Sequence, residues 1–357
     1  MKEFEELCLR LEKTSIEPRV TVMPDFFLDR IVRYNANLEG FIEDVKRIAS
    51  QGGGSLGFKR QLLIRGGNAA NMAAAIAMLG ARVTLILRTS WVGLKLLEIF
   101  MPSNVDLSRV KCDGELSMTV ALELVLQGRL CNIMISDPGS LALYGPEDLD
   151  AEDYEAIASS DFVCVFNWTS NKKGTQLAEE VFRRAKETGK AKTFMDTADP
   201  SQRAEEIPEF IKRVFKRDLL DALGVNENEA RWYARYLVRE SQEDPLKCAE
   251  ILHRELGLRV DLHTVDYAAT LEGGELYLTP TFNVKPLRAT GAGDAWNAGN
   301  IYGWALGLKP KLRLLLANAV AAYYITSPDA SHPTRFQVAN FLRGTVSLKD
   351  LPTRHLH

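Results

Sequence analysis

The stretch Thr290-Gly-Ala-Gly-Asp-Ala-Trp-Asn-Ala-Gly299 places a turn of small residues directly before a predicted helix that begins near Asp294. Because Gly291, Ala292 and Gly293 have small side chains, an anion can approach the backbone N–H groups at the start of that helix. Each such oriented donor is worth roughly 3 kcal/mol toward a developing charge, whereas the helix dipole contributes about 0.3–2 kcal/mol. Asp294 beside a bound phosphate can accept the proton of an attacking hydroxyl, so this stretch predicts phosphoryl transfer to an alcohol.

A second stretch, Arg65-Gly-Gly-Asn-Ala-Ala-Asn71, leads into an alanine-rich predicted helix that ends at Gly80. Paired glycines let the backbone approach a polyol, and amide side chains supply the donors and acceptors that its hydroxyls require. Taken alone, each stretch also fits a plain turn before a helix, with Asp294 as the helix cap. Together, in this order and spacing, the two resemble the signatures of the ribokinase-like (PfkB) carbohydrate and nucleoside kinases.

The resemblance extends from about residue 20 to residue 342. It implies that Asp294 is the catalytic base and that Gly291, Ala292 and Gly293 form the anion hole. The residues that it implies for an acceptor sugar, nucleoside or polyol are Asp29, Gly66, Gly67, Asn68 and Asn71. Asn167, at the end of a predicted strand, is a further acceptor candidate, although Asn in such a position more often forms a turn.

The same resemblance implies a nucleotide co-substrate with Mg²⁺. Its nucleotide residues in this chain are Asn226, Thr264 and Thr290, and Glu229 is expected to contact Mg²⁺ through bound water, since Mg²⁺ prefers oxygen ligands and keeps much of its hydration. Without the resemblance, Asn226-x-x-Glu229 is simply a helix capping box.

Two positions depart from the family pattern. Relatives usually carry Asp-Thr where this chain has Arg288-Ala289, and in relatives that depend on a monovalent cation this Asp lies at the potassium site. We expect the Arg288 guanidinium to supply the positive charge instead, so that activity does not depend on potassium; alternatively, Arg288 is a solvent-facing residue at a strand end. Asp266 stands where relatives commonly have glycine near the nucleotide, and an acid there repels phosphate. ATP is still the expected donor, with ADP as the alternative.

Strands and helices alternate along the chain, as in strand 162–166, helix 175–187 and strand 192–195. This pattern is typical of a mostly parallel sheet covered on both faces. The predicted fold is a doubly wound α/β sheet with helices on both faces and a small β lid from residues 34–62 and 117–136, the latter a hairpin turning at Gln127-Gly128. We expect residues 1–17 to form a helical extension, 18–345 the kinase domain and 346–357 a tail. Further helices are expected at about 203–217, 228–239 and 245–256.

The formal net charge is −3, and Lys and Arg are spread along the chain, which argues against a nucleic-acid partner. The sequence has no run of 18 apolar residues and no signal-peptide core, so we expect a cytoplasmic protein without a membrane segment. The five cysteines and five histidines show no metal-ligand spacing. The expected partners are therefore small molecules, together with a second copy of the chain in a homodimer formed through the lid.

Two readings from other classes stay open. A kinase-like protein that binds a ligand without catalysis would account for Arg288 and Asp266, but the presence of Asp294 argues against it. A dinucleotide-binding oxidoreductase also uses a Gly-x-Gly turn, but there the turn follows the first strand, near the start of the chain.

Overall fold

The computed structural model describes residues 2–351 except 58, 59, 127, 128, 188, 217, 240, 289 and 345, and for residues 35, 36, 129, 130 and 132 it describes only the backbone. Among these residues a nine-stranded sheet has the order β15-β14-β13-β12-β11-β10-β1-β4-β6, in which β14 is antiparallel to both of its neighbours and all other pairs are parallel. The strands are β1 (Arg19–Met23), β4 (Arg82–Leu85), β6 (Val105–Asp106), β10 (Phe162–Phe166), β11 (Lys192–Asp196), β12 (Ala222–Val225), β13 (Arg259–His263), β14 (Tyr267–Glu272) and β15 (Glu275–Pro280).

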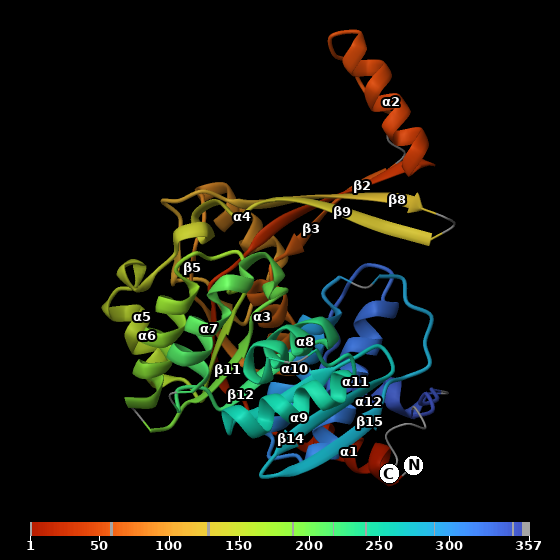
Figure 1. The fold of residues 1–357 in the computed structure, drawn as a ribbon. Coiled ribbons are helices and arrows are strands. Elements are labelled where there is room, and N and C mark those ends of the chain that lie inside the picture. The colour runs from red at the N-terminus through yellow and green to blue at the C-terminus, as the bar shows by residue number, and fades with distance from the viewer. Residues whose placement is uncertain are drawn as a thin grey trace.

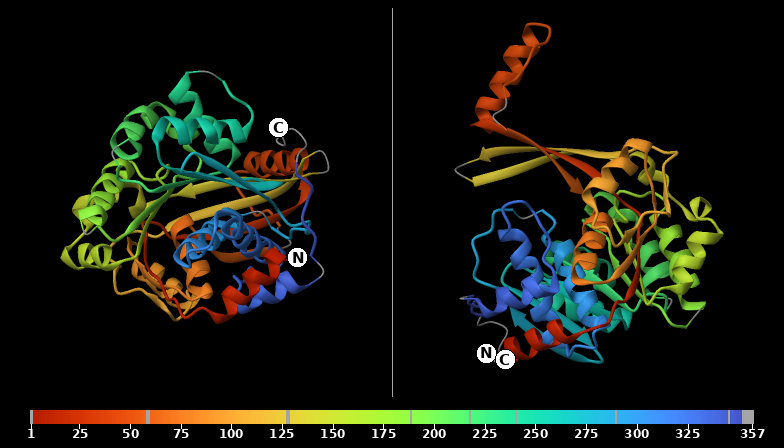
Figure 2. Two further views of the ribbon diagram at one scale, coloured as in Figure 1. Left: turned by 90° about the horizontal axis from the view of Figure 1, so that it is seen from below. Right: turned by 180° about the vertical axis from the view of Figure 1, so that it is seen from behind.

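Helices cover both faces of this sheet, as Figure 2 shows, which confirms the predicted fold class. Strand β10 illustrates the reason: Phe162, Cys164 and Phe166 lie in one core and Val163 and Val165 in the other, so the strand is apolar throughout. The first core involves α3 (Asn68–Leu79), α10 (Ala292–Ala305) and α11 (Pro310–Thr326), and the second involves α5 (Ala151–Ser159), α6 (Gly174–Glu187), α8 (Glu227–Val238) and α9 (Pro245–Leu256).

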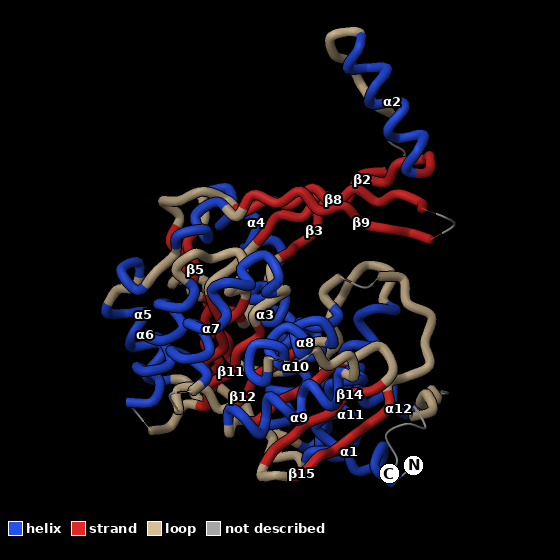
Figure 3. Tube along the Cα trace, viewed as in Figure 1, coloured by secondary structure: helices blue, strands red, loops and turns tan. Residues whose placement is uncertain are grey.

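A second sheet lies above the first and has the order β3-β2-β8-β9 (Figures 1 and 3). Its strands are β2 (Phe27–Asn37), β3 (Arg60–Gly66), β8 (Ser117–Leu126) and β9 (Arg129–Asp137). Helix α2 (Leu38–Ser50) projects from its far end. We call this sheet the lid sheet. The predicted turn at 127 and 128 lies outside the described residues, and β2 begins before residue 34, so that Asp29 belongs to the lid sheet.

The region around 203–217 differs from the single helix expected there. It contains three short segments, η3 (Pro200–Glu206), α7 (Ile207–Phe210) and the π-helical η4 (Ile211–Phe215). Arg203 interrupts η3 with φ −129° and ψ 34°, and Pro208, whose ring cannot continue a helix from the residues before it, begins a new helical segment in α7.

Further elements are α4 (Trp91–Phe100), β5 (Leu87–Arg88), β7 (Val110–Lys111), η1 (Gly139–Leu143) and η2 (Pro146–Asp148).

The N-terminal helix α1 (Lys2–Lys13) packs against α12 (Arg335–Arg343), so the two ends of the described chain meet. Cys8 is buried and donates from Sγ to the Ala339 carbonyl at 3.4 Å, and Arg343 pairs with Glu12. The expected tail 346–357 is described only to residue 351; Leu348 forms a bridge with Phe282. No described helix is long and apolar enough to cross a bilayer.

A buried charge cluster joins β13 to α10 and α11. Asp261 accepts from Arg259 Nε at 2.9 Å and from Asn300 Nδ2 at 2.8 Å, and Arg313 Nη2 lies 3.6 Å from its other oxygen. Burial raises the pKa of Asp261, but the charges of the two arginines outweigh burial and hold this pKa below its ordinary value. The carboxylate is therefore ionised and fully paired inside the fold.

Candidate active site

The small-residue turn adopts the conformation that an anion site requires. Gly291 has φ +82°, and a Cβ there would lie 2.7 Å from the Tyr324 hydroxyl, so only glycine fits. Helix α10 starts at Ala292 without a side-chain cap, and the N–H groups of its first turn have no partner within the helix. A Cβ at Gly293 would contact the His263 ring at 3.1 Å. The turn can therefore present free N–H groups to an anion.

Asp294 lies buried at the start of α10, where it faces the start of α3. Its Oδ1 accepts from Asn68 Nδ2 at 2.9 Å and its Oδ2 from Asn71 Nδ2 at 3.0 Å. Asn71 is in turn oriented by Arg65, whose Nε donates to Asn71 Oδ1 at 3.1 Å. Burial raises the pKa of Asp294 to about 8; the two amides lower this pKa, and the nearby negative charges raise it further. The structure thus places Asn68 and Asn71 on Asp294, where the sequence predicted acceptor contacts.

Asp25, which the sequence analysis did not select, holds the start of α3. Its carboxylate accepts the backbone N–H groups of Asn68 and Ala69, both at 2.9 Å, and Asn167 Nδ2 at 3.0 Å. Gly67 has φ +90°, and a Cβ there would lie 2.8 Å from Asp25 Oδ2. The available signal was an Asp directly after the first strand, at the sheet edge where open α/β proteins bind ligands.

A hollow of about 400 Å³, which we call the lid hollow, lies between the lid sheet and the loops that precede α10 and follow α11. Asp29 lines it, and burial raises the pKa of Asp29 to about 7 although a hydrogen bond from Thr119 lowers it. A Cβ on Gly66 would lie 2.2 Å from Asp29 Oδ2, so this glycine makes room for the carboxylate. Thr290, predicted at the nucleotide, lines this hollow with Asp29.

A second hollow of about 410 Å³ lies on the other side of the turn, and we call it the apolar hollow. Thr264 and His263 line it together with Ala292 and Gly293 and a largely apolar wall: Val265, Phe282, Val284, Pro286, Trp296, Ala321, Ala322 and Ile325. His263 was not predicted as a site residue from the sequence. Its ring packs against Trp296 with centroids 5.2 Å apart, and its Nε2 is buried with no hydrogen-bond partner among the described residues. Arg288 lines both hollows, whereas Thr290 lines only the lid hollow and Ala292 and Gly293 line only the apolar hollow. The turn that carries Asp294 therefore separates the two hollows.

Asp266 at the rim of the apolar hollow is neutralised. Lys349, which lines the hollow, places Nζ 3.1 Å from Asp266 Oδ1 and donates to the Val265 carbonyl at 2.8 Å. The pair removes much of the repulsion that a lone carboxylate would exert on a phosphate.

Asn226 and Glu229 form a reciprocal cap at the start of α8. Asn226 Oδ1 accepts the N–H of Glu229 at 3.0 Å, and the two Glu229 oxygens accept from the N–H and Nδ2 of Asn226 at 3.0 and 2.7 Å. Glu229 is buried, and burial followed by the charge of Asp196 raises its pKa well above the ordinary value. Neither residue lines the two hollows, although their neighbour Glu227 lines the apolar hollow.

Arg288 does not face solvent freely. Its guanidinium donates to three carbonyl oxygens at and beyond the end of α11: Tyr324 at 3.1 Å, Pro328 at 3.0 Å and Ser327. Its carbon Cζ also lies 5.7 Å from the Tyr324 ring centroid. The positive group therefore occupies a cluster of backbone oxygens beside the turn; Ala289 lies outside the described residues.

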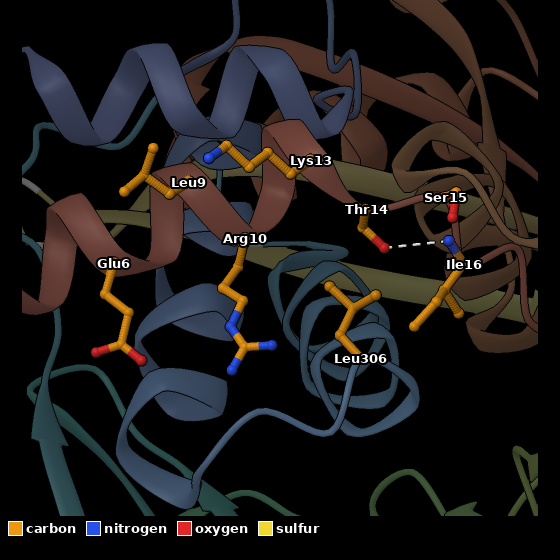
Figure 4. A pocket seen from close by; sticks show the side chains of 8 residues that line it. All are labelled: Glu6, Leu9, Arg10, Lys13, Thr14, Ser15, Ile16 and Leu306. Atoms are coloured by element: carbon orange, nitrogen blue, oxygen red, sulfur yellow. Dashed lines mark hydrogen bonds between the residues drawn. The ribbon is translucent and has the colours of Figure 1, made fainter.

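A further hollow of about 460 Å³ lies beside α1 and the end of α10 (Figure 4). Its lining includes Glu6, Leu9, Arg10 and Lys13, and it contains none of the predicted site residues. We therefore place the candidate site at the turn before α10.

Comparisons with known proteins agree with the fold. The family model described as pfkB family carbohydrate kinase matches residues 42–336. The structure is similar to Arabidopsis thaliana ribokinase, solved with ribose and ATP (TM-score 0.70, 19% identity, 92% of this chain and 100% of that one). It is also similar to Sinorhizobium meliloti adenosine kinase (0.70, 17%, 92% and 99%) and to Thermotoga maritima 2-dehydro-3-deoxygluconokinase (0.72, 16%, 92% and 99%). A search of curated protein sequences gave no match.

Proposed function

The chain belongs to the pfkB family of carbohydrate kinases, and we propose from this that it moves the terminal phosphoryl group of a nucleotide to a hydroxyl of a sugar, nucleoside or related polyol. The observation that carries the proposal is the position of Asp294 on the turn between the two hollows, at a helix start with free N–H groups. One hollow would hold the acceptor and the other the nucleotide.

In the proposed reaction, an acceptor hydroxyl in the lid hollow gives its proton to Asp294 while its oxygen bonds to the terminal phosphorus. The bond between that phosphorus and the bridging oxygen breaks, and the nucleotide leaves one phosphate shorter. The N–H groups of Gly291, Ala292 and Gly293 would stabilise charge that develops on the phosphoryl oxygens. Asn68 and Asn71 would hold the Asp294 carboxylate in place, since each donates to one of its oxygens.

We propose ATP as the donor, with ADP as the alternative, and the cytoplasm as the location because the nucleotide is available there. The apolar hollow supports a nucleotide, since a flat base requires an apolar slot and its phosphates would reach the turn at Gly293. Thr264 lines this hollow, but its hydroxyl is already bonded to Tyr267, donating to that carbonyl at 2.8 Å. We therefore assign the nucleotide phosphates mainly to the turn.

We propose that Mg²⁺ enters with the nucleotide phosphates. No group of three or more His, Cys, Asp or Glu side chains within the described ranges could hold a metal ion, and Mg²⁺ in kinase sites usually takes one or two carboxylates with phosphate oxygens and water. Glu229, acting through bound water, and Asp196 would fit this role: burial and then the charge of Asp196 raise the pKa of Glu229, and a cation would relieve the repulsion between the two carboxylates. Bound Mg²⁺ would neutralise charge on the transferring group.

We propose that the reaction does not depend on potassium. The supporting observation is that the Arg288 guanidinium already donates to the carbonyl oxygens of Tyr324, Ser327 and Pro328, the kind of oxygen cluster that would otherwise hold a monovalent cation. A fixed positive charge there serves the neighbouring turn without an added ion.

We also propose a homodimer that forms through the lid sheet. The face of this sheet that points away from the lid hollow carries exposed apolar side chains, including Leu63, Met118, Ile133 and Ile135 with 41–65% of their surface exposed. Contiguous apolar surface of this kind is typical of an interface between chains. Sedimentation analysis of the chain and of an Ile135→Glu variant would test the proposal.

The test of the kinase proposal is nucleotide consumption over a panel of sugars and nucleosides, with ATP and with ADP. Asp294→Asn should lower the rate by about 10²–10⁴-fold, because the acceptor loses its general base. Asp106→Asn, which changes an exposed Asp far along the chain, is the matched control and should leave the rate unchanged. Equal rates for wild type and Asp294→Asn would overturn the assignment of the base.

A further inference from the structure

Three successive rows of side chains lie on the face of the lid sheet that lines the lid hollow, and strand register defines each row. The first of the three, one row in from Gly66 at the end of β3, contains Ile64, Asp29, Thr119 and Ser136, which are paired across β3, β2, β8 and β9. Two residues further along come Leu62, Ile31, Ala121 and Met134, and two residues beyond these come Arg60, Arg33 and Glu123. Most of these residues line the lid hollow.

Each row offers a different chemistry. The first offers hydroxyl and carboxylate groups around Asp29, with Thr119 and Ser136 hydrogen-bonded to each other at 3.0 Å. The second is entirely apolar and would contact the carbon skeleton of a bound molecule. The third is charged, and two of its three described side chains are arginines, Arg33 and Arg60. The sheet face of the hollow is therefore polar in its first row and carries two arginines and one carboxylate in its third, while the opposite wall adds one charge of each sign, Arg288 and Asp329.

The charges of the third row do not cancel. Arg33 Nε pairs with Glu123 at 2.5 Å, which neutralises one arginine. Arg60 has no hydrogen-bond or ion-pair partner among the residues that the structure describes, although it lies directly opposite Arg33 in the register. Two adjacent like charges with one carboxylate leave a net positive charge, which destabilises the empty lid and favours an anion.

The spacing suits a small anionic sugar. Asp29 and Arg33 are four residues apart on one strand, so their Cα atoms are separated by about 13 Å. An arginine side chain that lies along the strand toward Asp29 would cover about half of that distance. The remaining gap matches a pentose or hexose with an acidic group at the end opposite to its reacting hydroxyl.

On the basis of the proposed kinase function, we propose that the acceptor is an anionic sugar, either a sugar phosphate or a sugar acid, whose acidic group binds Arg60 and Arg33 while a hydroxyl at its other end lies near Asp29 and Asp294. The guanidinium fork suits this role because it binds phosphate and carboxylate oxygens in pairs. The two anionic groups share this chemistry, and the experiment below separates them.

The experiment compares matched neutral and anionic acceptors at constant ionic strength: ribose with ribose 5-phosphate, fructose with fructose 6-phosphate, and glucose with gluconate. The anionic member of a pair should have a kcat/KM at least about tenfold higher, and the pair that shows the difference identifies phosphate or carboxylate. Arg60→Gln should raise KM for the anionic acceptor about tenfold or more without changing kcat, and Arg60→Lys should restore part of the loss. Arg47→Gln on α2, which removes an exposed arginine outside the hollow, is the control.

Neutral acceptors used as well as their anionic partners, or an anionic KM unchanged by Arg60→Gln, would overturn the inference and leave the kinase proposal standing. Absence of turnover with every acceptor would instead contradict the kinase proposal. In that case, calorimetry on the Asp294→Asn protein still decides the inference, since tighter binding of the anionic member by at least about tenfold supports it and equal binding refutes it.

Discussion

Raising the pH from 7 to 9 should increase kcat/KM for the acceptor about tenfold, because Asp294 must lose a proton before it can accept one. Burial raises the pKa of this carboxyl to about 8, against the opposing effect of the amides of Asn68 and Asn71. With that pKa, about one-tenth of Asp294 is ionised at pH 7 and about nine-tenths at pH 9. The same change at an exposed Asp would have no effect in this range.

The raised pKa also predicts a change in stability that does not depend on activity. The folded protein binds a proton at Asp294 more tightly than the unfolded chain does, so this stabilisation is fully present below about pH 4 and is lost as the pH rises through about 8. Asp294→Asn removes the titration. Its Tm relative to wild type should therefore increase between pH 4 and pH 8. In the Asp294→Asn variant one of the two acceptor oxygens becomes an amide donor, so one of the two neighbouring Asn side chains must change its orientation. Because Arg65 fixes the Asn71 amide, we expect the Asn68 amide to rotate and keep its hydrogen bond to the substituted side chain.

The assay is the initial rate at subsaturating acceptor from pH 6 to pH 9.5 at constant ionic strength, with thermal unfolding of both proteins over pH 4–9. Asp106→Asn serves as the control for both measurements. A wild-type profile that is flat over this range, or an Asp294→Asn protein that keeps the alkaline rise, would refute the reasoning that links burial of Asp294 to its proton affinity.

Three further changes test other parts of the structure. Gly66→Ala should raise KM for the acceptor at least about tenfold in initial-rate measurements, because the added Cβ would lie 2.2 Å from Asp29 Oδ2 and displace that carboxylate; an unchanged KM would contradict this placement. Arg288→Ala should lower kcat and make it rise with KCl at constant ionic strength, whereas a rise in the wild type would contradict the role of this arginine. Asp261→Asn should lower the free energy of unfolding at pH 7 by roughly 3–5 kcal/mol in urea titrations, because it takes the carboxylate from buried Arg259, whereas Arg313 keeps Glu272 at 3.0 Å. Since the pKa of Asp261 is lowered on folding, this stabilisation is present above about pH 4 and is lost as the pH falls through the folded pKa, so equal wild-type stability at pH 7 and at pH 3 would contradict the pairing.

Local patterns were sufficient to predict the fold class, and they also gave the place that we propose for the reaction. The alternation of apolar strands and amphipathic helices predicted the doubly wound sheet, since a strand such as Phe162–Phe166 that is apolar throughout must be covered on both faces. The stretch around Gly291 predicted a turn before a helix, because small residues before a helical run act through neighbours in the chain. These features depend on a few consecutive residues and can be read without knowing what they contact.

The tertiary structure decided which side chains meet. Asn68 was predicted to bind an acceptor, but it donates to Asp294, which is 226 residues away in the sequence. Asp25 supports α3 and Asn167 without belonging to any motif. Thr290 faces the lid hollow and not the apolar hollow. Such partners depend on how separate elements pack, and neither periodicity nor propensity carries that information.

The lid illustrates the same division most clearly. The sequence alone indicated a β lid from residues 34–62 and 117–136, of which the second is β-rich by composition, and the structure instead places helix α2 in much of the first. Only strand pairing placed Arg60 opposite Arg33 and both in the hollow with Asp29, because side chains alternate between the faces of a strand and one step in register would turn them to the other face. The residues that we propose to bind phosphate are thus recognised from the chain itself, whereas those that we propose to select the acceptor are recognised from the register of the lid sheet.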